Sequence, residues 1–311
     1  MPEVPKPDAP APEVPKLEVP KPDLVARDPR VRFILCADDY AQNSQVSAGI
    51  LDLAQAGRLS ATSVMVNGAG WPGDAPGLAA VSNRLAIGLH LNFTHGAPLG
   101  PMPRLAPQGR FPALGKLIAA ALLRQLDLAE IADEAERQLQ AFEAAMGFPP
   151  DHLDGHQHVH TLPGIRTAVL SVLQHRYPGR PMLLRDPSDR PGALLRRPEP
   201  LKAAIVAALS AGFATSAHRA GYLTNAGFSG FSDFADHPCA SQFERFLRHP
   251  GACPMIMCHP GLPGSVDDPI AARRPQELAA LRQYDGLGRL IWHPERATPG
   301  APLDWPTGKG V

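Results

Sequence analysis

The stretch HLDGHQHVHTLPG, at residues 152–164, holds four of the chain's 12 histidines. His156, His158 and His160 recur at every second position, and Asp154 precedes them at the same spacing. Residues at this spacing point to one face of an extended strand. Imidazole is a common metal ligand and titrates near neutral pH. If this segment is extended, it therefore indicates a metal or acid–base site, with a polar strand edge or an adventitious metal-binding tract as the alternative.

Composition argues against several classes of function. The chain has 311 residues, of which 44% are hydrophobic, enough for one large domain or two small ones. Its 30 basic and 30 acidic residues cancel and only 6% are aromatic, so no nucleic-acid-binding stripe or polybasic membrane surface is expected. We find no membrane-spanning apolar run and no secretory signal, and expect a cytoplasmic protein with four free cysteines.

Residues 1–30 are expected to lie outside the folded part of the chain. PEVPK occurs twice there and is followed by the near-copy LEVPK. Proline fixes φ and removes a backbone donor, so this segment predicts an extended, disordered tail. We place the folded domain at residues 31–297 and a second tail at 298–311.

From residue 31 onward, apolar runs alternate with stretches of helical periodicity. This alternation occurs at least six times and is typical of a mostly parallel sheet, either doubly wound or closed into a barrel. Residues 95–113, rich in Pro and Gly, predict a long loop. Strands are predicted at 31–39, 61–68, 85–93, from 152 through the histidines, at 181–187 and at 252–261; helices at 43–57, 76–82, 127–147, 165–176, 199–211, 239–248 and 275–284; and the apolar segment 288–293 completes the domain.

Polar residues follow the carboxyl ends of these strands, where barrel proteins assemble their sites. They are Asp38 and Asp39, His90, Arg185 and His259, besides the histidine cluster. Two histidines and one carboxylate can hold a divalent ion, which acidifies bound water and polarises a carbonyl. A second aspartate could then accept a proton and another histidine could donate one.

Each position also has a structural alternative. The two aspartates could cap the helix that begins near residue 43. His90 could be a core histidine, His259 could begin a turn, and Arg185 could be a surface cation. These alternatives weaken together, because all five residues occupy corresponding places in the strand–helix repeat.

Four motifs in order resemble the YdjC-like carbohydrate deacetylases, a family that includes chitooligosaccharide deacetylases. They are ILCADDYAQNSQVSAGILDLAQAGRLSATSVMVNG, IGLHLNFTHGAPL, HLDGHQHVHTLPG and MIMCHPG, and the resemblance covers roughly residues 31–295. It implies a distorted (β/α) TIM-like barrel related to polysaccharide deacetylases, a divalent ion, and hydrolysis of an N-acetyl group on a sugar. The ion is Mg²⁺ by family resemblance, with Zn²⁺ the alternative that ligand softness favours. Tyr40 and Ala41 replace the more usual phenylalanine and glycine.

The resemblance also implies roles for individual residues. It makes Asp39, His90 and His156 metal ligands, Asp38 the general base and His259 the general acid. His158 is expected to line the substrate pocket or to orient a metal ligand, Arg185 to bind the substrate, and His160 to be structural.

The leading hypothesis is therefore a metal-dependent hydrolase that acts on an N-acetylated saccharide. Another metal-dependent barrel hydrolase, acting on a cyclic amide or a phosphoester, is the enzyme alternative. A non-catalytic sugar- or metal-binding protein is the third reading, which the presence of both Asp38 and His259 disfavours. Specificity is expected in loops 95–113 and 186–200, the acetylated sugar is not indicated, and a homodimer is one open arrangement.

Overall fold

The computed structural model describes residues 32–306, apart from 69, 235–238, 248–250, 265–267, 286 and 297. The Pro-rich tail predicted at residues 1–30 lies outside the described residues and stays a prediction.

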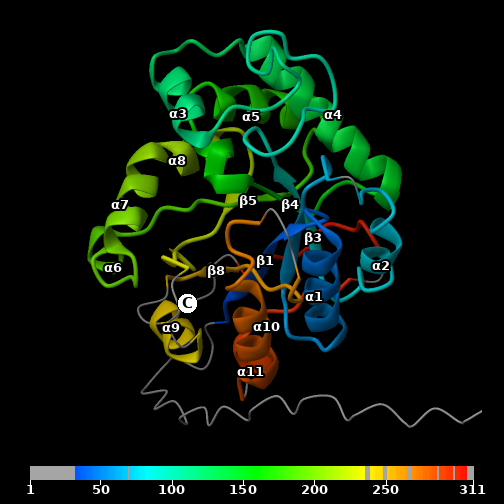
Figure 1. Ribbon diagram of the computed structural model, residues 1–311, viewed down its shortest axis with the longest axis vertical. Coiled ribbons are helices and arrows are strands. Elements are labelled where there is room, and N and C mark those ends of the chain that lie inside the picture. Colours follow the sequence, from blue (N-terminus) through cyan, green and yellow to red (C-terminus); the bar gives the residue numbers. More distant parts are fainter. Residues whose placement is uncertain are drawn as a thin grey trace, which may run out of the picture.

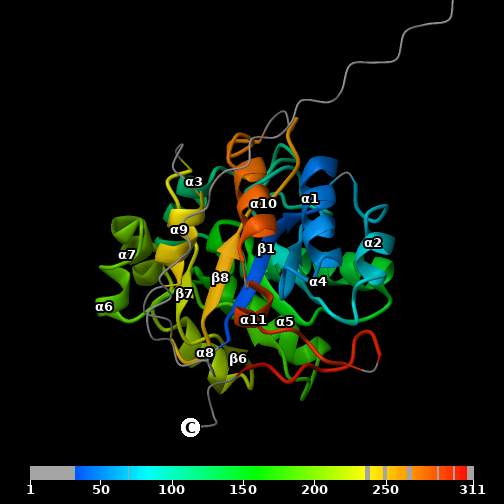
Figure 2. The same ribbon diagram turned by 90° about the horizontal axis from the view of Figure 1, so that it is seen from below.

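The core of the molecule is one curled sheet of parallel strands (Figures 1 and 2). The strands are β1 (Ile34–Tyr40), β2 (Ala61–Val64), β3 (Ala86–Leu91), β4 (His152–Gly155), β5 (Leu183–Leu184), β6 (Leu223–Thr224), β7 (Phe228–Ser229) and β8 (Met255–Cys258). Their order is β6-β5-β4-β3-β2-β1-β8-β7. Only residues 225–227 separate the edge strands β6 and β7 along the chain. The chain therefore brings the two sheet edges together without a ladder between them among the described residues, and the predicted distorted barrel is confirmed as an open one.

Helices surround this sheet on its outer side (Figure 1). They are α1 (Ser44–Gln55), α2 (Ala75–Ala79), α3 (Leu114–Leu122), α4 (Leu128–Met146), α5 (Ile165–Arg176), α6 (Pro191–Leu194), α7 (Pro200–Leu209), α8 (Phe213–Arg219), α9 (Cys239–Phe246), α10 (Arg274–Gln283) and α11 (Leu287–Leu290), with the 3₁₀ segment η1 (His156–Thr161). Among the described residues no single helix is long and apolar enough to cross a membrane, although the bent pair α7–α8 meets the length and composition criteria jointly.

Strand β1 is buried along its whole length and pairs with β2 on one side and β8 on the other. A strand that is covered on both faces needs a continuous apolar run rather than alternation, which explains the sequence of residues 34–37. The run ends in Asp38 and Asp39, so the fold carries two carboxylates to the carboxyl end of this buried strand. Asp39 adopts a positive φ of 72° and lies where the register with β2 shifts, between Ala37 and Tyr40.

Helix ends follow local chemistry. The side chain of Asn43 caps α1 by accepting a hydrogen bond from the Val46 amide at 3.0 Å, so the alternative in which Asp38 and Asp39 cap this helix is wrong. Asp127 caps α4, and Gly147 ends α4 in the left-handed conformation. The Glu130 side chain accepts hydrogen bonds from the backbone amides of Arg104 and Leu105, in the 95–113 loop.

The prediction of an extended histidine strand is wrong beyond residue 155. β4 ends at Gly155, and the chain continues as η1, in which Gln157 and His158 have positive φ values of 54° and 61°. Gly155 is required here because a Cβ atom on it would lie 2.9 Å from Nδ1 of His160. The histidines consequently leave the strand in different directions and do not share one face.

Other differences lie in the connecting segments. The helices α3, α6 and α8 were not predicted, and residues 288–293 form part of α11 followed by a single bridge between Ile291 and Phe33. Trp305, in the predicted C-terminal tail, is buried and stacks on Trp292 at a centroid distance of 4.9 Å. The four cysteines are free thiols, as predicted.

Candidate metal and catalytic site

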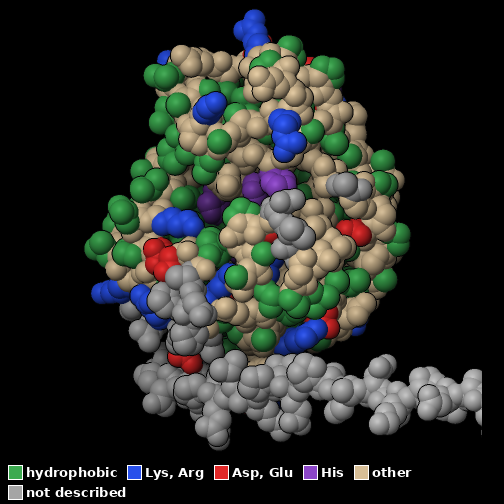
Figure 3. Space-filling model, viewed as in Figure 1, with side chains coloured by type: hydrophobic (Ala, Val, Ile, Leu, Met, Phe, Trp, Pro, Cys, Tyr) green, Lys and Arg blue, Asp and Glu red, His purple; other side chains and the backbone are tan. Residues whose placement is uncertain are grey.

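A cavity of about 360 Å³ opens at the carboxyl ends of β1, β3 and β8. In the space-filling view, histidine side chains lie in this hollow, beneath a rim of apolar and basic residues (Figure 3). The lining residues are Asp38, Asp39, Gln42, His90, Thr94, His95, Leu114, His156, Gln157, His158, Lys202, Val206, Phe231, Phe234, Met257, His259, Asp268, Pro269, Ile270 and Arg274. The cavity thus brings together six of the seven predicted site residues, and Arg185 lies beneath it.

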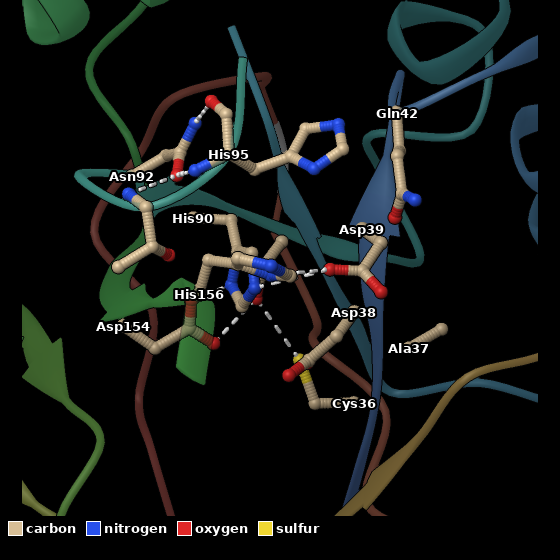
Figure 4. Close-up of polar contacts among 12 residues, drawn as sticks. Cys36, Ala37, Asp38, Asp39, Gln42, His90, Asn92, His95, Asp154 and His156 are labelled. Carbon is tan, nitrogen blue, oxygen red and sulfur yellow. Dashed lines mark hydrogen bonds and ion pairs between the residues drawn. The ribbon is translucent and has the colours of Figure 1, made fainter. Parts of the chain in front are cut away.

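Asp39, His90 and His156 converge at the base of this cavity (Figure 4). Oδ1 of Asp39 lies 3.3 Å from Nε2 of His90 and 3.1 Å from Nδ1 of His156. One potential ligand atom from each residue lies within 4.8 Å of the other two. Two imidazole nitrogens and one carboxylate oxygen match the donor types of a catalytic metal site that keeps positions open for water and substrate.

Arg274 fixes the remaining oxygen of Asp39. Its Nη2 donates to Asp39 Oδ2 at 2.8 Å and to Gln42 Oε1 at 2.9 Å, and its Nε pairs with Asp268. Burial disfavours the charged carboxylate, but the Arg274 cation and the hydrogen bonds from His156 and His90 hold the pKa of Asp39 well below its usual range. Asp39 therefore carries a negative charge with Oδ1 facing the two histidines.

His90 is held from behind by Asp154, which places Oδ1 2.6 Å from Nδ1 of the imidazole. A carboxylate on one ring nitrogen fixes the ring and directs the other nitrogen to a metal. Burial lowers the pKa of His90, but Asp154, Asp38 and the hydrogen bonds to Asp154 and Asp39 outweigh it and raise the pKa to about 10. The surroundings of His90 therefore favour a positive charge at its Nε2 atom. That charge can be a proton, or a bound metal cation that displaces the proton.

Two further groups of potential ligands lie nearby, namely Cys36–His152–Asp154 and Asp38–His90–Asp154. Both depend on Asp154. Its two oxygens already accept hydrogen bonds from His90 and Ser63 and pair with Arg185 at 2.5 Å. The group formed by Asp39, His90 and His156 fits a metal better, because it lines the cavity and leaves Asp154 in its supporting place.

Asp38 lines the cavity beside this group and is paired with Arg185. Nη1 and Nη2 of Arg185 each donate to one oxygen of Asp38 at 2.6 Å. The Arg185 side chain is 0% exposed, so neither the surface-cation alternative nor the predicted contact with substrate matches its position. In this structure Arg185 orients Asp38 and Asp154 rather than facing the cavity.

His259 follows β8, which pairs with β1, and lines the cavity. Its backbone N–H donates to Oε2 of Glu277 at 2.6 Å, and its ring meets Phe234 edge-on at a centroid distance of 5.5 Å. Burial lowers the pKa of its imidazole, against the opposing effect of the Asp39, Glu277 and Asp38 carboxylates.

The two remaining histidines of the cluster have separate surroundings. His158 lines the cavity with its ring edge-on to Phe228 and Phe231, both at 5.5 Å. Its Nδ1 atom is buried and has no hydrogen-bond partner among the described residues, and burial lowers the pKa of the His158 imidazole well below its usual value. His160 is fully buried and its Nε2 donates to the Arg185 carbonyl at 2.7 Å, a structural position.

Sequence reasoning did not assign roles to three residues of the site. Asp154 lies in the HLDGHQHVHTLPG motif, two residues before His156, so the sequence pattern could have indicated its role. His95 contacts His156 ring to ring at 6.0 Å and could have been found from the second motif. Arg274 lies in an Arg-Arg-Pro stretch at the start of a helix and gives no sign that it reaches β1.

An open α/β barrel with aspartates and histidines at the carboxyl ends of its strands belongs to the class of barrel proteins that assemble a polar site at that end of the sheet. The chain belongs to the YdjC-like protein family, which it matches over residues 32–285. It is 37% identical over 153 residues to a carbohydrate deacetylase from Homo sapiens, covering 47% of this chain and 46% of that protein. It is 38% identical over 170 residues to a chitooligosaccharide deacetylase from Serratia marcescens, covering 53% of this chain and 64% of that one.

These matches span about half the length of the human relative and under two thirds of the bacterial one. A solved structure with a similar fold is a putative cellobiose-phosphate cleavage protein from Enterococcus faecalis V583. Its TM-score is 0.61 at 20% sequence identity, and the match covers 84% of this chain and 96% of that one. At this identity the likeness shows the fold alone.

Proposed function

We propose that this protein is a metal-dependent hydrolase that removes the N-acetyl group from an acetamido sugar. The observation that carries the proposal is the convergence of Asp39, His90 and His156 in a cavity that Asp38 and His259 also line. The names of the two relatives above, carbohydrate deacetylase and chitooligosaccharide deacetylase, support the same reaction class.

Asp39, His90 and His156 would hold the ion, with Asp154 and Arg274 fixing the orientation of the ligands. A divalent ion supplies Lewis acidity, which lowers the pKa of water and polarises the acetyl carbonyl. The two nitrogen donors favour Zn²⁺ over Mg²⁺ by ligand softness, whereas the family resemblance favours Mg²⁺. Metal content of the purified protein decides between them.

Asp38 acts as the general base in this proposal. It accepts the proton of the water molecule whose oxygen attacks the acetyl carbon. Both Asp38 oxygens are already bound to Arg185, which fixes the carboxylate plane while leaving each oxygen a further lone pair. A base held in this way stays in position throughout the reaction.

His259 acts as the general acid. The C–N bond breaks only if the nitrogen receives a proton, because an amide anion is a very poor leaving group. His259 follows β8, the strand paired with β1, and lines the same cavity as Asp38. In this proposal it gives its proton to that nitrogen, so the products are acetate and a free amino sugar. His158, between two phenylalanines, is proposed to contact the sugar.

The test is hydrolysis by the full-length protein loaded with Zn²⁺ or Mg²⁺ and given a panel of N-acetylated saccharides. Acetate and free amine should appear in equal amounts. A cyclic amide or phosphoester hydrolysed in place of these sugars would favour the second enzyme class. Sugar binding without any product would favour a non-catalytic protein.

A further inference from the structure

A second cavity, of about 380 Å³, adjoins the candidate site. Both cavities share five lining residues, namely Leu114, Gln157, His158, Lys202 and Val206. The second cavity is therefore continuous with the place where the sugar is proposed to bind. It runs between α3 and α7 and passes over η1.

The walls of this groove are aliphatic. Leu114 and Ile118 line it from α3, and Leu201 and Ile205 line it from α7. Each pair is four residues apart, so on both helices the apolar side chains form a ridge along one face. The polar part of the lining includes Glu199, Lys202 and the hydroxyl pair in which Ser210 Oγ donates to Thr161 Oγ1 at 2.9 Å.

This apolar surface stays open in the structure. Leu201 is 73% exposed and Ile205 is 52% exposed. Among the described residues, the other exposed large aliphatic side chains line neither cavity; they are Leu99, Leu122, Leu123, Leu128 and Leu195. Soluble proteins rarely leave contiguous apolar surface uncovered without a ligand or partner for it.

We infer that the groove binds an apolar aglycone of the substrate, so that the substrate is an amphiphilic N-acetyl glycoside. This inference rests on the proposed function and narrows its substrate class. The sugar would lie in the histidine cavity, with the apolar group leaving it past Val206 and between α3 and α7. The groove is continuous with the candidate site, and this favours a part of the substrate as its occupant. A second copy of the chain or a bilayer would cover the outer ends of Leu201 and Ile205, but neither would need a passage into the site.

Alkyl β-glycosides of N-acetylglucosamine with methyl, butyl and octyl chains, kept below their micelle concentrations, test the inference. Full burial of a methylene is worth about 4-fold in affinity, and an open groove that covers one side is expected to give roughly 2-fold. The value of kcat/KM for acetate release should therefore rise about 10²-fold from methyl to octyl. Dissociation constants from calorimetry should follow the same trend.

A matched pair of variants separates the groove from general surface hydrophobicity. Ile205→Gln introduces an amide into the groove wall and should reduce the octyl-to-methyl ratio of kcat/KM and of affinity at least about 5-fold. Leu195→Gln makes the same kind of change at a side chain that is 79% exposed and lines neither cavity. This control should leave the ratio unchanged.

The outcomes distinguish the two proposals. Suppose that no glycoside yields acetate, but the affinity for the glycosides still rises with chain length and falls in Ile205→Gln. The inference about the groove is then supported and the proposed function fails. If the methyl glycoside is hydrolysed and chain length has no effect on kcat/KM or affinity, the groove inference is overturned and the function stands. A wild-type dimer that Ile205→Gln converts to a monomer, or vesicle binding without chain-length dependence, would also overturn it.

Discussion

Arg185, after β5, and Asp38, on β1, form a two-bond ion pair across 147 positions of the chain, with both distances at 2.6 Å. Nη2 of the same guanidinium reaches Asp154, which holds His90. One buried cation thus links the proposed base to a residue behind the proposed metal ligands. A planar guanidinium can bind two carboxylates at fixed angles, which an ammonium group cannot do.

The first prediction concerns this link. Arg185→Lys should retain the buried charge but lose the two-bond geometry, so Asp38 should shift and kcat should fall about 10²-fold. Arg185→Ala should leave two buried carboxylates uncompensated and lower the free energy of unfolding by about 3–5 kcal/mol. Urea unfolding and acetate release measure both effects.

The control is Arg282→Lys, because Arg282 forms an exposed pair with Asp52 at 2.7 Å. That change should alter the free energy of unfolding by no more than about 1 kcal/mol, and the activation free energy for turnover by no more than the same amount. Equal effects at Arg185 and Arg282 would rule out the special role of the buried pair.

The second prediction concerns the metal ligands. Alanine in place of Asp39, His90 or His156 should remove stoichiometric metal from the purified protein, because each supplies one of three donors. His175→Ala, on the exposed side of α5, is the matched control and should retain stoichiometric metal. Metal analysis after dialysis gives the readout, and full occupancy in His90→Ala would remove His90 from the ligand set.

The third prediction concerns proton donation. His259→Ala should retain metal but lose turnover by about 10²–10⁴-fold, the usual contribution of a positioned acid. The alkaline limb of the pH–rate profile should flatten, because a general acid works only while it is protonated. An unchanged alkaline limb would show that the proton comes from another group, with His158 the next candidate in the same cavity.

The fourth prediction concerns stability at acid pH. Burial lowers the pKa of His160 to about 4, against the raising effect of its hydrogen bond to the Arg185 carbonyl. An unfolded histidine has a pKa of about 6.5, so between these values the unfolded state binds more protons and the free energy of unfolding falls as the pH falls. His160 should contribute about 2 kcal/mol to the loss of stability between pH 7 and 4.5.

Urea unfolding at the two pH values measures this loss. His160→Gln should show a smaller difference between them than the wild type, whereas His175→Gln, at an exposed position, should match the wild type. A wild-type difference that persists undiminished in His160→Gln would assign the acid sensitivity to other groups.

Much of the site could be predicted because strand ends are visible in the sequence. Apolar runs that stop at Asp38, His90 and His259 mark the carboxyl ends of parallel strands, and such ends meet in space. The geometry of the histidine cluster could not be predicted in the same way. Alternation at residues 156–160 suggests a strand, but the left-handed backbone of Gln157 and His158 depends on how Gly155 packs against His160.

The supporting residues and the groove were beyond the reach of local patterns. Arg274 acts on Asp39 from 235 positions away, and only the docking of α10 beside α1 brings them together. Helix α3 follows a Pro- and Gly-rich loop, and its N-cap residue, Ala113, has no side chain that could cap it, so the sequence holds no signal for its start. The apolar wall that it contributes was therefore missing from the sequence-based account of specificity.

Acetate release before and after removal of the metal tests the central claim most directly. The full-length, metal-loaded protein should release acetate and free amine in equal amounts from an N-acetylated saccharide. Release should fall to background after chelation and dialysis, and return when the divalent ion is added back to the wild type but not to Asp39→Ala. Undiminished release from protein shown to be metal-free, or no release from any acetamido sugar by the loaded protein, would contradict the account.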